Sequence, residues 1–189
     1  GGTSPAVCMP SRAMVNTGRT LFHLTGAGER IAEEHVTLGE TFRSRGYRTF
    51  GAGKWHNGPT SNHRSFTDGA EIFFGGMADH WNVPAYHFDP TGRYDATCPY
   101  IENPEASNVM QMRACDHIHA GKHSTDIIAN AAIRFIDDVE DDTPFFAYTA
   151  FLAPHDPRTM PRRYLEMYAP EEVTLPGNFM GGHPFDNGE

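Results

Sequence analysis

Residues 124–152 have the sequence STDIIANAAIRFIDDVEDDTPFFAYTAFL, which contains a helix pattern followed directly by a strand pattern. Ser124 or Thr125 can cap the helix, because both residue types accept hydrogen bonds from exposed backbone amides. Apolar side chains then recur at helical spacing, at Ile127, Ile128, Ala131, Ala132, Phe135, Ile136 and Val139. Residues 145–152 form a short apolar run that predicts a buried strand.

A second helix and strand pair lies upstream, over residues 37–52. Thr37 with Glu40 three positions later has the pattern of a capping box, and Gly46 is expected to end the helix. Residues 47–52 then have the composition of a strand. Two helices that each lead into a strand predict an α/β sandwich with a largely parallel sheet.

The loops after the two strands contain the most reactive side chains. They are Gly-Lys-Trp-His at residues 53–56 and Ala-Pro-His-Asp at residues 153–156. Ligands of open α/β sheets bind beyond the carboxyl ends of the strands, so a site is expected there. Residues 57–123 are rich in Pro, Gly and His with little periodicity, and they are interpreted as a long excursion of substrate-facing loops.

Composition narrows the class of protein. The chain has 189 residues and a net charge of -9, which disfavours a nucleic-acid-binding face or a basic membrane-surface patch. No apolar stretch approaches the ~20 residues of a membrane-spanning helix. The first residues lack an initiator Met and a signal sequence, and the last residues resemble the middle of a loop. We therefore expect one domain that is incomplete at both ends.

The chain has three cysteines, and because this number is odd they cannot all pair in a disulfide framework. Cys98 and Cys115 could pair with each other. The sequence Cys-Asp-His-Ile-His at residues 115–119, together with His123, contains metal-compatible side chains, but no second ligand pair accompanies it. An ordinary loop is favoured there over a structural zinc site.

Residues 8–12, CMPSR, are the sharpest local motif. Pro10 fits the first turn of a short helix over residues 11–16 that Gly18 ends, and Cys8 would lie at its N-terminus. A helix N-terminus beside Arg12 favours anions, which suggests a nucleophile rather than a merely buried thiol. A Cys-dependent phosphatase loop needs five residues between Cys and Arg, and only three are present.

The same motif resembles the first signature of the type I sulfatases, in which Cys-x-Pro-x-Arg directs a maturation enzyme to oxidise the Cys to formylglycine. Residues 46–56, GYRTFGAGKWH, are similar to the second signature of that family, and residues 151–155, FLAPH, to its third conserved strand end. The resemblance covers nearly the whole chain and is weakest over residues 57–123. Asn16 stands at a position where the first signature usually has an apolar residue.

The resemblance implies a partial sulfatase catalytic domain over residues 1–189, with an alkaline-phosphatase-like fold. It implies a sulfuric ester hydrolase in which Cys8, as hydrated formylglycine, attacks sulfur with one hydroxyl and later expels sulfate through the other. Arg12 would hold the hydrate, Lys54 and His56 would bind sulfate oxygens, and His155 would bind sulfate and protonate the leaving group.

The family also binds a divalent cation, usually calcium. The resemblance carries over only the formylglycine of Cys8 as a ligand, with Asp186 and Asn187 as a weak candidate pair, so the chain alone is expected to be poorly active. It further implies a formylglycine-generating maturation enzyme as a partner and a secreted, periplasmic or lysosomal location.

Two alternatives stay open at this point. A phosphonate or phosphate monoester hydrolase of the same superfamily can use the same formylglycine. An inactive relative would bind sulfated glycans through Lys54, His56 and His155, although it would not need an intact maturation motif. The substrate is expected to be an aryl or carbohydrate sulfate, and several aromatic rings favour a sugar platform: Trp81, Tyr86, His87 and Tyr94.

Overall fold

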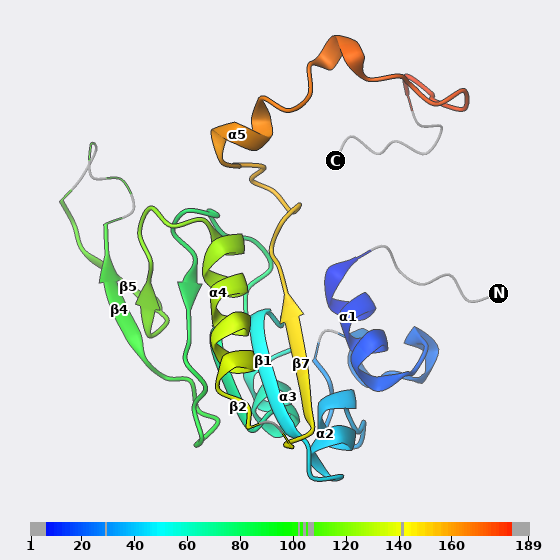
Figure 1. The fold of residues 1–189 in the computed structure, drawn as a ribbon, viewed down its shortest axis with the longest axis vertical. Coiled ribbons are helices and arrows are strands. Elements are labelled where there is room, and N and C mark those ends of the chain that lie inside the picture. The colour runs from blue at the N-terminus through cyan, green and yellow to red at the C-terminus, as the bar shows by residue number, and fades with distance from the viewer. Residues whose placement is uncertain are drawn as a thin grey trace. The chain divides into compact units, whose positions relative to one another are not determined.

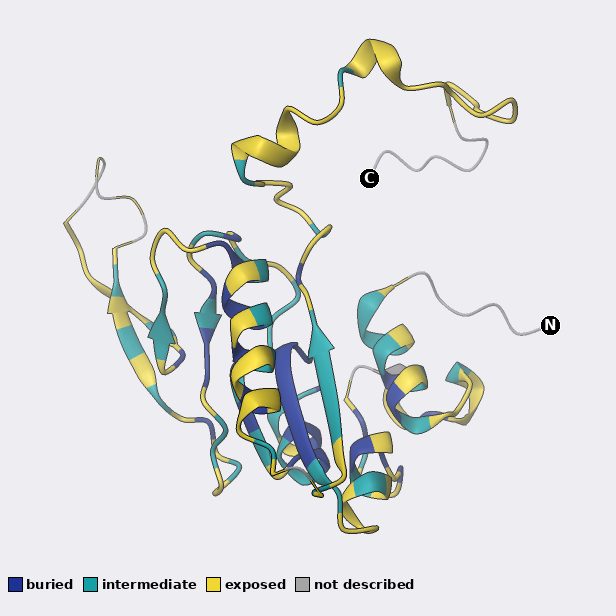
Figure 2. Ribbon diagram, viewed as in Figure 1, coloured by how far each residue is buried: buried dark blue, intermediate teal, exposed yellow. Residues whose placement is uncertain are grey.

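The computed structural model describes residues 7–28, 30–101, 103, 105, 108–140 and 142–182. The chain forms two units, residues 1–159 and residues 160–189. The described part of the second unit holds α5 (Arg162–Leu165) and the 3-10 helix η3 (Pro170–Glu172), and nearly all of its residues are exposed (Figure 2). Among the described residues, no helix combines the length and the apolar character that crossing a membrane requires.

The first unit is built on a three-stranded parallel sheet with the order β2-β1-β7 (Figure 1). The strands are β1 (Arg48–Lys54), β2 (Asp68–Phe73) and β7 (Phe145–Ala150). The prediction of a parallel sheet is therefore confirmed. β7 is only half-buried, since within the described residues it has a strand neighbour on one side only.

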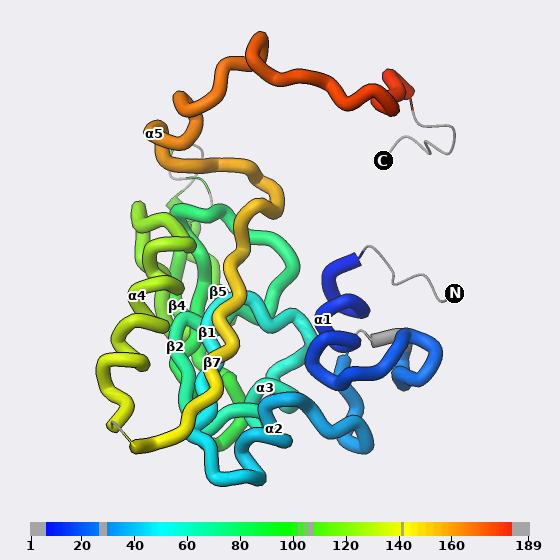
Figure 3. The backbone as a smooth tube through the Cα atoms, turned by 45° about the vertical axis from the view of Figure 1, so that its right-hand side comes forward, coloured from blue at the N-terminus to red at the C-terminus, as the bar shows by residue number. Residues whose placement is uncertain are grey.

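Helix α4 (Ser124–Asp137) covers one face of the sheet (Figures 1 and 3). Its buried stripe packs against Phe50 and Ala52 of β1 and consists of Ile127, Ile128, Ala131 and Phe135. Ile136 lies off this stripe and is exposed. Neither Ser124 nor Thr125 caps the helix, contrary to expectation. The cap is His123, whose Nδ1 accepts a hydrogen bond from the backbone amide of Thr125.

The opposite face of the sheet is covered by α2 (Leu38–Arg43) and α3 (Pro59–Ser65), with α1 (Cys8–Thr17) beyond them (Figures 1 and 3). The predicted capping box of Thr37 and Glu40 is present, and Gly18 ends α1 in a left-handed conformation. Two 3-10 turns follow α1, η1 (Leu21–His23) and η2 (Thr25–Gly28). This face packs around Trp55 and Phe66, whose rings meet edge to face at 5.4 Å.

Residues 57–123 contain more regular structure than expected. They include α3 and the sheet strand β2, so the prediction of loops is wrong for those segments. Two small antiparallel pairs follow: β3 (Pro84–Ala85) with β6 (His117–Ile118), and β4 (Thr97–Tyr100) with β5 (Gln111–Ala114). A bridge between Ile72 and Tyr86 joins this region to β2.

Candidate functional site

The start of α1 lies beside the carboxyl end of β1. The Arg12 guanidinium donates to the backbone carbonyl of Lys54 and, at 3.4 Å, to the hydroxyl of Tyr148. The fully buried Asn57 donates through Nδ2 to the Met9 carbonyl at 2.9 Å. Two segments more than 40 residues apart in the sequence are thereby held in contact, and Cys8 is placed next to the end of the strand.

Lys54 is the last residue of β1 and is 1% exposed. Its Nζ donates to the carbonyl of Gly76 at 2.5 Å and interacts electrostatically with Cys8. Burial lowers the pKa of Lys54, the charge of Arg12 lowers it further, and Cys8 acts in the opposite direction. A buried ammonium beside a second cation is costly without a negative partner, so this position favours an anionic ligand.

His56 follows two residues later with a left-handed φ of 67°. Burial lowers its pKa to about 4, and the charges of Lys54, Arg12 and then His155 add to this effect. The ring is therefore neutral near pH 7. Its Nδ1 is buried and has no hydrogen-bond partner among the described residues. The ring packs against Gly76, where an added Cβ would lie 2.9 Å from Cε1 of the imidazole.

His155 comes from the loop after β7, and a second histidine supports that loop. The buried His80 has Nε2 2.9 Å from the His155 carbonyl, so Nε2 must carry the proton and donate. Nδ1 of His80 is hydrogen-bonded to the hydroxyl of Ser124 at 2.8 Å. The first residue of α4 thus helps to position the His155 loop. Neither supporting residue was predicted from the sequence.

The five predicted residues Cys8, Arg12, Lys54, His56 and His155 are therefore brought together from α1, the end of β1 and the end of β7. Within the described residues, the hydrogen-bond partners of Arg12, Lys54 and His155 are backbone carbonyls and the Tyr148 hydroxyl, not carboxylate oxygens. Two cations and two imidazoles around one potential nucleophile can bind a tetrahedral oxyanion and stabilise the negative charge that develops on it.

A calcium cage beside Cys8 does not emerge from the described residues. Calcium prefers six to eight oxygen ligands, whereas the charged neighbours of Cys8 are the cations Lys54 and Arg12. Asp186 and Asn187 lie outside the described residues. The described side chains around Cys8 do not fit this ion by themselves.

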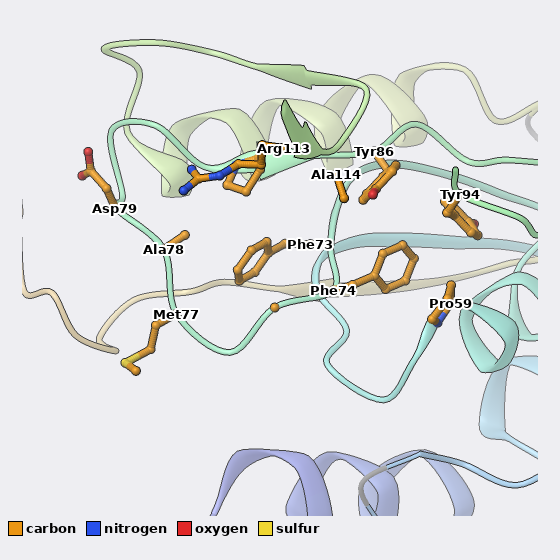
Figure 4. Close-up of a pocket in the computed structure, with 12 residues that line it drawn as sticks. Pro59, Phe73, Phe74, Met77, Ala78, Asp79, Tyr86, Tyr94, Arg113 and Ala114 are labelled. Carbon is orange, nitrogen blue, oxygen red and sulfur yellow. The ribbon is translucent and has the colours of Figure 1, made fainter. Parts of the chain in front are cut away.

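A separate cavity of about 510 Å³ lies beside the segment that follows β2 (Figure 4). It is lined by rings of Phe73 and Phe74, with Asp79 and Arg113 as polar groups, and it includes none of the five predicted residues. Tyr86 and Tyr94 line it too, but each is only 7% exposed, so these two rings pack the interior.

The two remaining cysteines lie close together. Cys98 in β4 and Cys115 just after β5 have their sulfur atoms 2.6 Å apart, and both are free thiols in the structure. Burial raises the pKa of the Cys115 thiol to about 12. Their pairing stays a prediction.

Comparisons with known proteins agree with the motifs. An arylsulfatase of Hemicentrotus pulcherrimus is 29% identical over 170 residues, covering 82% of this chain and 30% of that protein. An ulvan-active sulfatase of Formosa agariphila is 28% identical over 179 residues, covering 91% of this chain and 31% of that protein. The chain thus spans about a third of the length of these curated relatives.

Solved structures share the fold. Ps i-CgsB in complex with k-i-k-neocarrahexaose gives a TM-score of 0.58 at 22% identity, over 88% of this chain and 38% of that one. BT4656, solved with its substrate D-glucosamine-2-N,6-O-disulfate, gives a TM-score of 0.55 at 20% identity. This match covers 82% of this chain and 26% of that one. A family model described as Sulfatase matches residues 2–178. This match covers most of the sequence, and the chain belongs to the sulfatase family.

Proposed function

We propose that the whole protein hydrolyses sulfate monoesters and that its nucleophile is a formylglycine made from Cys8. The observation that carries the proposal is the buried Lys54, which interacts electrostatically with Cys8 beside a second cation, Arg12. This arrangement suits a sulfate group, whose oxygens need fixed positive charge. The intact CMPSR motif supports the maturation step, and a formylglycine-generating enzyme would be the partner.

The formylglycine supplies, when hydrated, one hydroxyl that attacks sulfur and a second whose deprotonation releases sulfate. Arg12 is placed to orient residue 8, because its guanidinium is anchored to the end of β1. Lys54 is a compact charge for a sulfate oxygen. His155 is the candidate proton donor to the leaving group, and the ring of His56, which is neutral near pH 7, is a candidate hydrogen-bond partner for a sulfate oxygen.

The substrate class is also a proposal. Two relatives carry names that point to sulfated carbohydrates: the ulvan-active sulfatase and human iduronate 2-sulfatase, which is 26% identical over 90% of this chain. Another is named arylsulfatase. We therefore expect an aryl or carbohydrate sulfate. Calcium is expected from the family, with ligands outside the described residues.

The test begins with co-expression of the protein and a formylglycine-generating enzyme. Peptide mass spectrometry with an aldehyde-reactive probe should find an aldehyde at residue 8, and Cys8→Ala should carry none. Turnover of a chromogenic aryl sulfate should exceed that of the matching phosphate ester. Unmodified Cys8 beside a converted control substrate would contradict the maturation step, and faster phosphate turnover would favour the phosphatase alternative.

Individual roles are tested in the matured protein. Removal of one fixed charge-stabilising group typically costs ~3 kcal/mol of transition-state stabilisation, or ~100-fold in rate. We expect a loss of turnover of this size for each of three substitutions: Lys54→Met, His56→Ala and His155→Ala. Lys122→Met is a matched control, because this lysine is exposed. If the control loses as much activity as Lys54→Met, the specific role of Lys54 is wrong. An inactive glycan binder would show no turnover in the unaltered protein.

A further inference from the structure

Three side chains outside the candidate active site converge on one point. The carboxylate of Glu71 lies between two imidazoles, with Oε2 at 2.9 Å from Nε2 of His117 and Oε1 at 3.0 Å from Nε2 of His119. The three candidate ligand atoms lie within 4.8 Å of one another. The Glu71 side chain is only 6% exposed, whereas that of His119 is 36% exposed. The cluster is therefore enclosed on one side and open on the other.

Backbone geometry aims these side chains. Ala52 of β1 pairs with Ala70 and Gly53 pairs with Ile72, so Glu71 is the extra residue of a β-bulge. Its φ of 54° is left-handed, which is rare for a residue other than glycine. A bulge commonly redirects a side chain next to a functional site.

The two histidines are brought to the same place by their strand. His117 lies in β6 and His119 follows two residues later. Side chains two residues apart in an extended segment point to the same face. β6 pairs with β3, and the bridge between Ile72 and Tyr86 connects β3 to β2, which carries Glu71.

Hydrogen bonds alone leave this cluster incomplete. Among the described residues, Glu71 has no Lys or Arg partner in an ion pair. Nδ1 of His117 is buried without a hydrogen-bond partner there. The neighbouring Asp116 is a further carboxylate, which accepts from the backbone amide of His87, and the His87 ring lies tilted against that of His117 with the ring centroids 4.5 Å apart. A buried carboxylate in such surroundings is stabilised by a bound cation.

We propose that Glu71, His117 and His119 bind a zinc ion, with water as the fourth ligand on the open side. Two imidazoles and one carboxylate form an established zinc ligand set, and imidazole nitrogen disfavours calcium and magnesium. Zinc bonds of ~2.0–2.1 Å in tetrahedral geometry place ligand atoms roughly 3.4 Å apart. The observed separations of 2.9 and 3.0 Å run to the two different oxygens of the Glu71 carboxylate, and one ligand atom from each residue lies within 4.8 Å of the others, so small side-chain shifts suffice. The ion would tie β6 to the central sheet through β2.

Zinc uptake by the metal-free chain tests the site. A Cys8→Ser background removes one competing thiol from the measurement. One zinc ion should bind per chain, and zinc at 100 times its Kd should raise Tm by roughly 5–10 °C. Glu71→Gln and His119→Ala should each weaken binding by more than about 100-fold, since even outer-sphere partners cost 10- to 100-fold. His87→Asn is the matched control, because His87 contacts His117 but is not a proposed ligand. The Kd of this variant for zinc should stay within a few-fold of the parent's.

X-ray absorption identifies the atoms around the zinc. The expected first shell contains nitrogen and oxygen at ~2.0–2.1 Å, and sulfur at ~2.3 Å would place the ion on Cys98 and Cys115 instead. Circular dichroism without zinc checks that the variants fold, and apo Glu71→Gln should be at least as stable as the apo parent because it removes a buried charge. A sulfur shell, an absence of zinc uptake, or equal uptake by His119→Ala would each overturn the proposal.

Discussion

The depressed pKa of His56 makes the stability of the protein depend on pH in a way that one substitution should remove. The ring has a pKa of about 4 in the folded protein because it is buried and faces Lys54 and Arg12. In the unfolded chain a histidine titrates near ~6.5. Between these two values the unfolded state binds a proton that the folded state does not, so the free energy of unfolding falls as the pH falls from about 6.5 to about 4.

The size of the effect follows from the two pKa values. With a folded pKa of about 4 and an unfolded pKa of ~6.5, the protein would lose ~2 kcal/mol at pH 5 relative to high pH, and ~3.4 kcal/mol below pH 4. The His56 ring is only partly enclosed, so solvent screening reduces these figures. We expect about 1 kcal/mol at pH 5. His56→Asn removes the titrating group, and asparagine tolerates the left-handed backbone at this position.

Urea unfolding at a series of pH values compares the parent with His56→Asn. The difference in the free energy of unfolding between pH 7 and pH 5 should be about 1 kcal/mol larger in the parent. Lys54→Met should make the parent's dependence shallower, because one of the charges that lower the His56 pKa is gone. Adding sulfate should also make this pH dependence shallower, since a bound dianion raises the pKa of His56. Equal losses in parent and His56→Asn would refute the reasoning.

Three further predictions concern neighbouring residues. Lys54→Met should leave the ligand-free protein as stable as the parent, or ~1 kcal/mol more stable in urea unfolding, because it removes a buried charge, and Lys122→Met should change stability by less than ~0.5 kcal/mol. Gly76→Ala should lower turnover at least 10-fold and cost ~1–3 kcal/mol, because its Cβ would collide with the adjacent imidazole, and unchanged kinetics would contradict this packing. Ser124→Ala should cost ~1 kcal/mol and reduce kcat by removing the hydroxyl that orients His80, and an unchanged kcat would show that this support is dispensable.

The parts of the site that the sequence predicted are those in which short-range patterns determine position. Cys8 and Arg12 lie one helical turn apart. Lys54 and His56 follow directly from a strand that the composition of residues 47–52, after the expected helix stop at Gly46, indicated. The position of His155 follows in the same way from the strand β7. Parallel strands bring their carboxyl ends to one edge, so these separate segments could be expected to meet.

The parts that sequence analysis missed depend on contacts between distant residues. β2 has the sequence DGAEIF, in which a glycine and two acidic residues hide the strand pattern. His80 acts through the backbone of a loop 75 residues away, and nothing local marks it. The wrong cap of α4 has a similar cause, because histidine is an uncommon cap and the neighbouring Ser124 is instead engaged with His80.

One irregularity in the sheet bears on both the candidate active site and the proposed zinc site. The register between β1 and β2 shifts at Ala52 and Gly53, and Gly53 has a φ of 80°, where an added Cβ would collide with the carbonyl oxygen of Ala150. On β1 this shift comes just before Lys54, and on β2 it sets Glu71 apart from the ladder. A side chain at position 53 would meet both the strained φ and the neighbouring backbone, so the bulge depends on glycine there. The same local distortion therefore aims an ammonium at Cys8 and a carboxylate at two histidines, which a regular pair of strands could not do at these positions.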